Sequence, residues 1–284
     1  MLRGLNGGTV PPSAESPREE KPGEGEPWEN HYKQSRHHFP LKNYIIHAFP
    51  ILGELLRSEE KRYILECGCG TGSTLLPLIL EFPDSNATFV GFDISETALK
   101  YFSENPTAEK LIGESRLHLF PYDVSRPSEE SGENCKRRKM EGEVEENVVV
   151  KNVPTLAGTK FDAVLLVFVL SALDHIGNMV LALERLSSLL KPGGVILFRD
   201  YAVADHNFFR FLRKNEQNNV EELSFSKGDK TKQFFFEEEF VEKLFSKVNM
   251  KKTGPIQYHC NRIENRKNGK RMDKIFINAV FEKC

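Results

Sequence analysis

The fold of this chain is decided by the stretch Tyr63-Ile64-Leu65-Glu66-Cys67-Gly68-Cys69-Gly70-Thr71-Gly72-Ser73. Its first residues are mostly apolar and predict a β-strand, the alternating glycines predict a tight turn, and a helix is expected over Ser73–Leu80. Glycine has no Cβ, so the turn can adopt positive φ angles and a ligand can lie against its backbone. The free N–H groups at the start of the helix point into the same space. We therefore predict a ligand site at this turn.

The glycine spacing separates two classes of ligand. A dinucleotide-binding turn follows the pattern G-x-G-x-x-G and holds a pyrophosphate at the helix N-terminus. Here Gly72 comes one position early, and Glu66, just before the turn, would repel a pyrophosphate. A carboxylate at this place suits the sulfonium and amino groups of S-adenosylmethionine. We therefore expect S-adenosylmethionine as the cofactor; the alternative is a tight turn in an unrelated α/β protein.

Two further acidic residues follow later strands. A second strand, Ala87–Phe92, ends in Asp93, roughly 20 residues past the turn, where an acid holds ribose hydroxyls in nucleotide-binding folds. A third strand, Leu117–Tyr122, ends in Asp123, which can reach an adenine amino group. The cofactor-binding residues predicted from these patterns are Glu66, Gly68, Gly70, Gly72, Asp93 and Asp123.

The composition is that of a soluble globular protein, because the 284 residues are 39% hydrophobic and 28% charged. No run of about 20 apolar residues is present, so we expect no membrane span. Residues 1–27 lack the apolar segment of a secretory signal. The five cysteines form no CxxC pair, which favours free thiols in a reducing compartment and no metal site. We expect a cytoplasmic protein, with the nucleus as a second compartment.

The net charge of −2 and the pI of about 6.5 argue against a surface that binds nucleic acid over its whole extent. An RNA substrate would have to meet local basic clusters or be presented by a partner. The candidate contacts are Lys227, Lys230, Lys232, Arg266, Lys267, Lys270 and Arg271.

The chain divides into a tail, a domain and an insert. Residues 1–27 are rich in Pro, Gly, Glu and Ser and are expected to be disordered. A mixed-charge run over residues 126–158 predicts a disordered insert in the domain that spans residues 28–284. Order begins near Trp28, which lies four residues before Tyr32 on one helix face. From the residues alone, that helix is either a core element or a lid over the cofactor.

Apolar patterns in the domain predict alternating strands and helices. The run Phe161–Leu170 predicts a strand buried on both faces, and Val195–Phe198 predicts the next one, with Arg199-Asp200-Tyr201 at its carboxyl end, where ligands bind in open α/β sheets. Other predicted elements are helices over Leu41–Leu56, Glu96–Phe102, Asp174–Leu190 and Phe234–Val248, and strands over Ile256–Cys260 and Lys274–Phe281. This order predicts an α/β, Rossmann-like fold with a seven-stranded, mostly parallel sheet and a C-terminal antiparallel strand pair.

Several of these residues match one family. The matching pieces are Leu65-Glu66-x-Gly68-Cys69-Gly70-x-Gly72, Asp93-x-Ser95, Val167-Phe168-Val169-Leu170-Ser171-Ala172 and Leu197-Phe198-Arg199-Asp200-Tyr201. The first piece is shared by most class I methyltransferases, and the last two are more specific. Apart from the insert, residues 28–284 therefore resemble the methyltransferase-like family of tRNA 3-methylcytidine methyltransferases.

The resemblance implies an S-adenosylmethionine-dependent methyltransferase domain that acts on cytidine N3 in the anticodon loop of tRNA, and it favours the lid over the core element at Trp28. The cofactor contacts that it implies are Trp28, Tyr32, Gly68, Asp93, Asp123, Val124 and Val167. The chain departs from the family at Phe39-Pro40-Leu41-Lys42-Asn43, where the family has Phe-Phe-Lys-Asp-Arg, and at Lys274, Phe276 and Asn278. These departures lie in the RNA-facing half, so they bear on the substrate rather than on the methyl donor.

The expected catalytic residue is Asp200, with Arg199 and Tyr201 beside it. Cytosine N3 carries a lone pair, so its methylation needs no general base, and catalysis would consist of positioning and charge stabilisation. The product ring is cationic, so a nearby carboxylate would stabilise the transition state. The alternative is a structural ion pair between Arg199 and Asp200. Stacking on the base is expected from Tyr201, Phe208 and Phe209, although the two phenylalanines fit a core equally well.

Three functions are compatible with the sequence. The first is 3-methylcytidine formation in tRNA, helped by a tRNA-binding protein such as an aminoacyl-tRNA synthetase, because the pI indicates modest intrinsic affinity for RNA. The second is methylation of a small molecule or a protein on the same fold, which the altered segment 39–43 favours. The third is a non-catalytic relative that binds a partner, which the intact cofactor residues disfavour.

Overall fold

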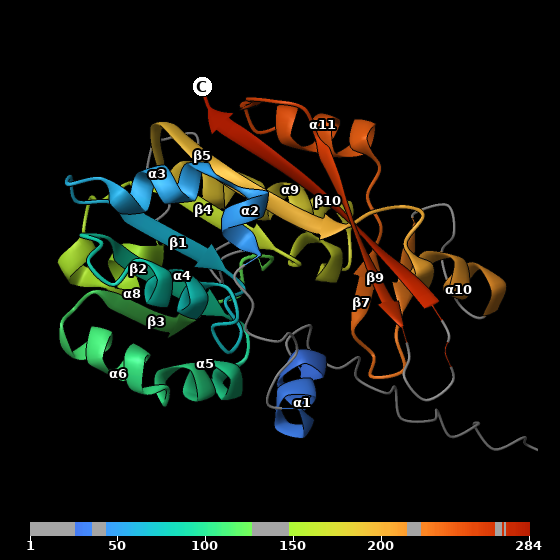
Figure 1. The fold of residues 1–284 in the computed structure, drawn as a ribbon, viewed down its shortest axis with the longest axis horizontal. Coiled ribbons are helices and arrows are strands. Elements are labelled where there is room, and N and C mark those ends of the chain that lie inside the picture. Colours follow the sequence, from blue (N-terminus) through green and yellow to red (C-terminus); the bar gives the residue numbers. More distant parts are fainter. Residues whose placement is uncertain (1–25, 36–43, 127–147, 215–222, 265–268, 270) are drawn as a thin grey trace, which may run out of the picture.

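A mixed β-sheet forms the centre of the computed structural model, which describes residues 26–35, 44–126, 148–214, 223–264, 269 and 271–284 (Figure 1). The strand order is β3-β2-β1-β4-β5-β10-β8, and β9 pairs with β10. The strands are β1 (Tyr63–Cys67), β2 (Thr88–Asp93), β3 (Leu117–Pro121), β4 (Phe161–Val167), β5 (Leu190–Tyr201), β8 (Met250–Lys252), β9 (Gln257–Glu264) and β10 (Arg271–Lys283). The first five are parallel, and β10 is antiparallel to its three neighbours. The predicted α/β sheet is confirmed, with β8 as an eighth strand among the described residues.

Helices cover both faces of the sheet. The α-helices of the described residues are α1 (Glu26–Gln34), α2 (Ile45–Ala48), α3 (Ile51–Arg57), α4 (Leu75–Glu81), α5 (Glu96–Ser103), α6 (Pro106–Gly113), α8 (Val148–Asn152), α9 (Ile176–Leu189), α10 (His206–Lys214) and α11 (Glu238–Ser246). Alternate residues of each strand face opposite layers, so Leu65 packs with α8, α9 and α11, whereas Ile64 packs with α2 to α6. The central strands are therefore buried on both faces, as their continuous apolar sequence predicted.

The end of β4 differs from the prediction. The strand stops at Val167, and Phe168 adopts a left-handed conformation with φ of 59°. A short 3-10 helix, η2 (Leu170–Ala172), follows. The predicted strand over Phe161–Leu170 is therefore three residues too long, because an apolar run does not show where a chain turns.

The start of β5 also differs. The residues Lys191-Pro192-Gly193-Gly194, expected to end a helix, lie in the strand at an irregularity of its register with β4. A Cβ on Gly194 would lie 2.9 Å from the carbonyl oxygen of Phe161. Glycine at this position therefore allows the close approach of two backbones rather than a helix end.

Two predicted helices are shorter than expected. The helix over Leu41–Leu56 is split into α2 and α3 at Pro50, and residues 41–43 lie outside the described residues. The helix over Phe234–Val248 begins only at Glu238, because residues 232–234 form strand β7 (Lys232–Phe234), which pairs with β6 (Ser224–Ser226). This β6–β7 hairpin was not predicted.

The domain boundaries need two corrections. Helix α1 begins at Glu26, two residues before the predicted start of order. In the predicted insert, residues 148–156 form α8 and the 3-10 helix η1 (Pro154–Leu156), and Val149, Val153 and Leu156 are buried in the core. Residues 1–25, 39–43 and 127–147 lie outside the described part of the chain. Within the described part, no helix is both long and apolar enough to span a membrane.

Candidate functional site

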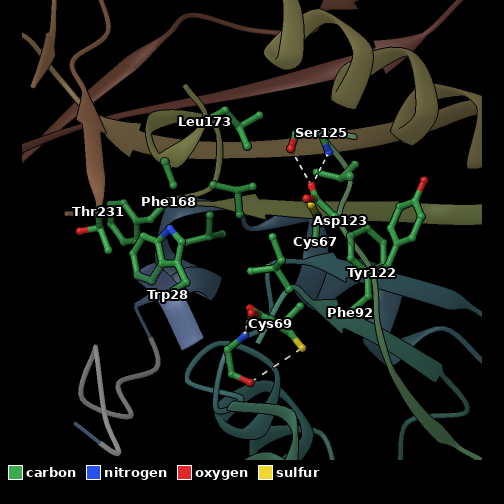
Figure 2. Close-up of a pocket in the computed structure, with 18 of the residues that line it drawn as sticks. Trp28, Cys67, Cys69, Phe92, Tyr122, Asp123, Ser125, Phe168, Leu173 and Thr231 are labelled. Carbon is green, nitrogen blue, oxygen red and sulfur yellow. Dashed lines mark hydrogen bonds between the residues drawn. The ribbon is translucent and has the colours of Figure 1, made fainter. Parts of the chain in front are cut away.

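A cavity of about 830 Å³ opens at the carboxyl ends of β1, β2 and β4 (Figure 2). It brings together residues from α1, the glycine turn, the ends of β2 and β4, the segment after β3, and the β6–β7 hairpin. The predicted cofactor residues that line it are Trp28, Tyr32, Glu66, Gly68, Gly70, Asp93, Asp123, Val124 and Val167. Residues more than 200 positions apart in the sequence, such as Trp28 and Lys232, therefore share one wall.

The glycine turn is fastened to the end of β2. Gly68, Gly70 and Gly72 all have positive φ angles, of 66°, 51° and 82°. The backbone N–H of Gly70 donates a hydrogen bond to Asp93 Oδ2 at 2.8 Å, and the N–H of Ser95 donates to Asp93 Oδ1 at 2.9 Å. Asp93 therefore holds the turn in shape as well as lining the cavity.

Gly72 is the exception among the predicted cofactor residues, because it does not line the cavity. A Cβ at this position would meet three ring atoms of Phe102 at 2.5–2.8 Å. Phe102 is fully buried. Gly72 therefore allows the turn to pack closely on α5, and the structure gives it no direct contact with the cavity.

Two buried carboxyl groups, those of Glu66 and Asp93, line the cavity. Burial raises the pKa of Glu66 to about 8 and the pKa of Asp93 to about 6, although hydrogen bonds at each carboxyl group offset part of the effect. Glu66 is 2% exposed, and its Oε2 atom has no hydrogen-bond partner among the described residues. An orphaned buried carboxyl oxygen in a cavity wall fits a cationic ligand, so these residues fit S-adenosylmethionine.

Asp123 lies on the side of the cavity that Figure 2 shows with Tyr122 and Ser125. Its Oδ1 atom accepts hydrogen bonds from the N–H of Ser125 at 2.9 Å and from Ser125 Oγ at 2.6 Å. Its Oδ2 atom lies 3.0 Å from Arg126 Nε. Asp123 therefore keeps a fixed orientation after β3, and its contact with an adenine amino group stays a prediction.

Helix α1 closes the cavity from one side. Tyr32 is 7% exposed and packs on the glycine turn, because a Cβ on Gly70 would lie 2.6 Å from its Oη. The β6–β7 hairpin holds the same helix: His31 Nδ1 lies 3.2 Å from Asp229 Oδ2, and Lys227 Nζ lies 5.3 Å from the centre of the Trp28 ring. Helix α1 therefore forms one wall of the cavity, and its role as a lid stays a prediction.

Glu29 joins α1 to the beginning of α5. It accepts hydrogen bonds from Ser95 Oγ at 2.7 Å, from the N–H of Thr97 at 3.3 Å and from Thr97 Oγ1. Burial alone would raise the pKa of Glu29, but these bonds and the charge of Lys33 lower it to about 2. The carboxylate is thus held ionised between the lid and the segment that follows Asp93.

We expect the substitution Glu29→Gln to weaken cofactor binding by about tenfold, since bonds to a carboxylate contribute about 1.5–3 kcal/mol and the amide loses the charge. Titration of the cofactor against the fluorescence of Trp28, the single tryptophan of the chain, measures the effect. Glu26→Gln at the exposed start of α1 is the matched control and should bind like the wild type. Equal affinities of all three proteins would show that this contact does not support the lid.

The three predicted catalytic residues lie behind the cavity wall. Asp200 is fully buried, its Oδ2 accepts the N–H of Ser171 at 3.0 Å, and its Oδ1 accepts the N–H of Tyr201 at 2.9 Å. Burial raises its pKa to about 7. None of Asp200, Arg199 and Tyr201 lines the cavity. The geometry therefore offers no direct contact between Asp200 and a bound base.

The alternative of an Arg199–Asp200 ion pair is not seen either. The guanidinium of Arg199 is 4% exposed, and its Nη1 donates to Asn278 Oδ1. Its carbon lies 4.5 Å from the ring centre of Phe276 and 4.9 Å from that of Tyr44. Aromatic faces and an amide oxygen thus surround this cation. Its charge and that of Asp200 still attract each other, although burial has the larger effect on the pKa of both groups.

Other predicted contacts are spread over the fold. Phe208 packs in a small core with Phe211, Phe225 and Phe235, and Phe209 is 47% exposed outside the cavity. Of the basic candidates, Lys230 and Lys232 line the cavity, and Arg271 pairs with Glu264 at 3.3 Å. Arg266, Lys267 and Lys270 lie outside the described residues.

Sequence reasoning missed several residues of the cavity wall, among them Phe168 and Thr231. Phe168 lies in an apolar run that looks like uninterrupted strand, and its left-handed φ has no local signal. Thr231 belongs to a hairpin of short, irregular strands. The one available signal was the match of Phe168 to a family-specific motif.

Comparison with known proteins agrees with this geometry. A methyltransferase domain model matches residues 65–196. The tRNA N(3)-cytidine methyltransferase METTL6 of Rattus norvegicus is 30% identical over 258 residues, which cover 90% of this chain and 78% of the relative. The tRNA N(3)-methylcytidine methyltransferase trm140 of Schizosaccharomyces pombe is also 30% identical, over 90% of this chain and 73% of the relative.

A solved structure shares the fold. The S-adenosylmethionine-dependent methyltransferase from Anabaena variabilis superposes with a TM-score of 0.59 at 15% identity, over 92% of this chain and 95% of that protein. The similarity therefore extends over nearly the whole sheet and its helices. On the strength of the sequence relatives, the chain belongs to the family of tRNA N(3)-cytidine methyltransferases.

Proposed function

We propose that the protein is an S-adenosylmethionine-dependent methyltransferase that forms 3-methylcytidine in the anticodon loop of tRNA. The observation that carries the proposal is a single cavity lined by two kinds of chemistry. Glu66 and Asp93 beside the glycine turn suit a cationic cofactor. Phe168 and Lys230 suit a flat base attached to a phosphate backbone. The family relatives support cytidine N3 as the acceptor atom.

The cofactor residues divide by role in this proposal. The backbone of Gly68 and Gly70 gives close approach, Glu66 balances the positive charge, Asp93 holds ribose hydroxyls and Asp123 reads the adenine. Gly72 acts only by shaping the turn. The remaining cofactor contacts are Trp28, Tyr32, Val124 and Val167, which form the lid and the apolar walls.

Methylation of cytosine N3 requires no general acid or general base from the protein. S-adenosylmethionine, when bound, supplies a methyl group on a sulfonium. Cytosine N3 has a free lone pair, so the protein's task is to unpair the base, orient it and exclude water. The carboxyl groups of Glu66 and Asp93 favour positive charge in the cavity throughout.

In place of direct catalysis, we assign Asp200, Arg199 and Tyr201 to positioning. Asp200 binds the N–H of Ser171 and thereby holds the turn after β4. The carbonyl oxygen of Arg199 accepts the N–H of Phe168 at 2.8 Å. The ring of Tyr201 lies 4.9 Å from that of Phe168. All three therefore fix the segment that presents Phe168 to the cavity.

Nucleoside analysis tests the proposal. The purified chain is incubated with labelled S-adenosylmethionine and total tRNA, and the RNA is digested to nucleosides. We expect the label in 3-methylcytidine. Transfer of the label to a small molecule or a protein instead would support the second function considered above. Binding of the cofactor with no transfer to any acceptor would support a non-catalytic, partner-binding protein.

We further propose that efficient modification needs a helper tRNA-binding protein, such as an aminoacyl-tRNA synthetase, and that the protein works in the cytoplasm. The net charge of −2 supports the need for a helper, because RNA affinity rests largely on phosphate contacts. We also propose that the activity belongs to one domain, predicted over residues 28–284 and beginning with α1 at Glu26. In the same assay, addition of the helper should raise the rate on tRNA, and full activity of the chain alone would contradict this.

A further inference from the structure

Phe168 has a strained backbone at the edge of the cavity. Its φ of 59° is unfavourable for a residue with a Cβ, and it is more so for one with a bulky ring. Such strain persists only where the surroundings enforce it, and it gathers at functional sites. Here the enforcing contacts are the hydrogen bond from the N–H of Phe168 to the carbonyl oxygen of Arg199 and the bond from Ser171 to Asp200. The surrounding structure therefore holds Phe168 in a backbone conformation that its side chain disfavours.

The ring is firmly supported from behind. Its centre lies 4.9 Å from that of Tyr201 and 5.3 Å from that of Phe276, and the guanidinium carbon of Arg199 lies 5.9 Å away. The residue is nevertheless half-buried rather than buried, and it lines the cavity. Phe168 therefore presents a rigid, flat, apolar surface to the cavity, with little freedom to move.

The location separates this surface from the adenine side. Phe168 follows Val167 at the end of β4, next to β1 and its glycine turn. Figure 2 shows Phe168, Trp28 and Thr231 on one side of the cavity, and Tyr122, Asp123 and Ser125 on the other. Phe168 thus lies across the cavity from Asp123, the residue to which the proposed function assigns the adenine.

We propose that Phe168 is the surface on which the acceptor base stacks, so that it sets the orientation of the base and the affinity for the RNA. This inference rests on the function proposed above. Stacking of one base on an aromatic ring is worth roughly a 5- to 150-fold change in binding. It also explains why Asp200, Arg199 and Tyr201 are gathered behind this residue.

Four substitutions separate the ring from the backbone. Phe168→Ala and Phe168→Gly both remove the ring, but glycine accepts positive φ without strain. Phe168→Leu keeps apolar bulk without a flat face, and Phe168→Tyr keeps the flat face. Leu80→Ala, which trims an exposed apolar side chain outside the cavity, is the control.

For each variant, kcat and KM for 3-methylcytidine formation are measured with tRNA, together with cofactor affinity by calorimetry and the melting temperature. The Ala, Gly and Leu variants should lower kcat/KM for tRNA by roughly 5- to 150-fold and leave cofactor affinity unchanged. The Gly variant should have a higher melting temperature than the Ala variant and should lose as much activity. The Tyr variant should retain activity, and Leu80→Ala should match the wild type.

Several results would overturn the proposal. Equal losses of cofactor and tRNA affinity would make Phe168 part of the cofactor wall. Full activity of the Leu variant would show that apolar bulk at this position is enough and that a flat ring is not needed. Higher activity of the Gly variant than of the Ala variant would show that the loss comes from backbone strain and not from the missing ring. If the wild-type protein binds the cofactor but forms no 3-methylcytidine, both the proposed function and the stacking role of Phe168 are contradicted. If 3-methylcytidine forms at the wild-type rate in all four variants, only the stacking role of Phe168 is contradicted.

Discussion

Replacing Gly72 by alanine should destabilise the folded protein by about 3 kcal/mol, which lowers the melting temperature by roughly 6 to 12 °C. Two effects add. The φ of 82° is unfavourable for alanine, and the new Cβ would lie within 2.5–2.8 Å of three atoms of the Phe102 ring. That ring is fully buried and cannot move aside without disturbing the contact between α5 and the sheet. Thermal unfolding followed by circular dichroism measures the loss.

Gly177→Ala is the matched control for this substitution. Gly177 lies in α9, and no atom stands within 4 Å of the position its Cβ would take. Alanine is a better helix former than glycine, so this variant should be unchanged or more stable by about 0.5–1 kcal/mol. A Gly72→Ala protein that melts with the wild type would show that the turn can shift away from α5, contrary to the packing described.

The substitution Glu66→Gln should weaken S-adenosylmethionine binding by about 30- to 100-fold, because a buried charge pair that loses one partner costs several kcal/mol. Glutamine keeps the shape of the side chain and removes its negative charge. S-adenosylhomocysteine has no sulfonium charge, so its affinity should fall less. Calorimetric titration with both ligands measures the difference, and Glu54→Gln on the exposed side of α3 is the control.

Proton release gives a second readout for the same residue. Burial raises the pKa of Glu66 to about 8, so at about pH 7 the free protein keeps a proton on this carboxyl group. A cationic ligand favours the ionised form and should expel that proton. Titrations in buffers with different ionisation enthalpies should therefore show proton release in the wild type, fading as the pH rises above 8, and none in Glu66→Gln. Equal heats in all buffers would mean that the protonation state of Glu66 does not change when the ligand binds.

The parts of the site that are local in sequence were predictable. A strand, a glycine turn and a helix follow one another between Tyr63 and Glu81. Asp93 ends β2, and Asp123 follows shortly after the end of β3 at Pro121. Parallel strands in this order bring their carboxyl ends to one edge of the sheet. Glu66, Asp93 and Asp123 therefore meet in the cavity as expected.

The parts that depend on distant contacts were not predictable. Asp200 looks catalytic from its place at a strand end, but the turn that contains Ser171 takes up one of its oxygens and the backbone of Tyr201 takes up the other. The strand β8 and the β6–β7 hairpin have three residues per strand, which is too short for a periodic pattern. The backbone reversal at Phe168 is imposed by its neighbours, against the preference of its own side chain.

The closure of the cavity by α1 has a consequence for the newly made chain. His31 and Asp229, which hold the helix to the hairpin, are 198 positions apart. At translation rates of about 5–20 residues per second, the hairpin leaves the ribosome roughly 10 to 40 s after the helix. Until then, α1 lacks its contact with the β6–β7 hairpin. The cavity of the nascent protein therefore lacks the contact between this wall and the hairpin until synthesis is nearly complete.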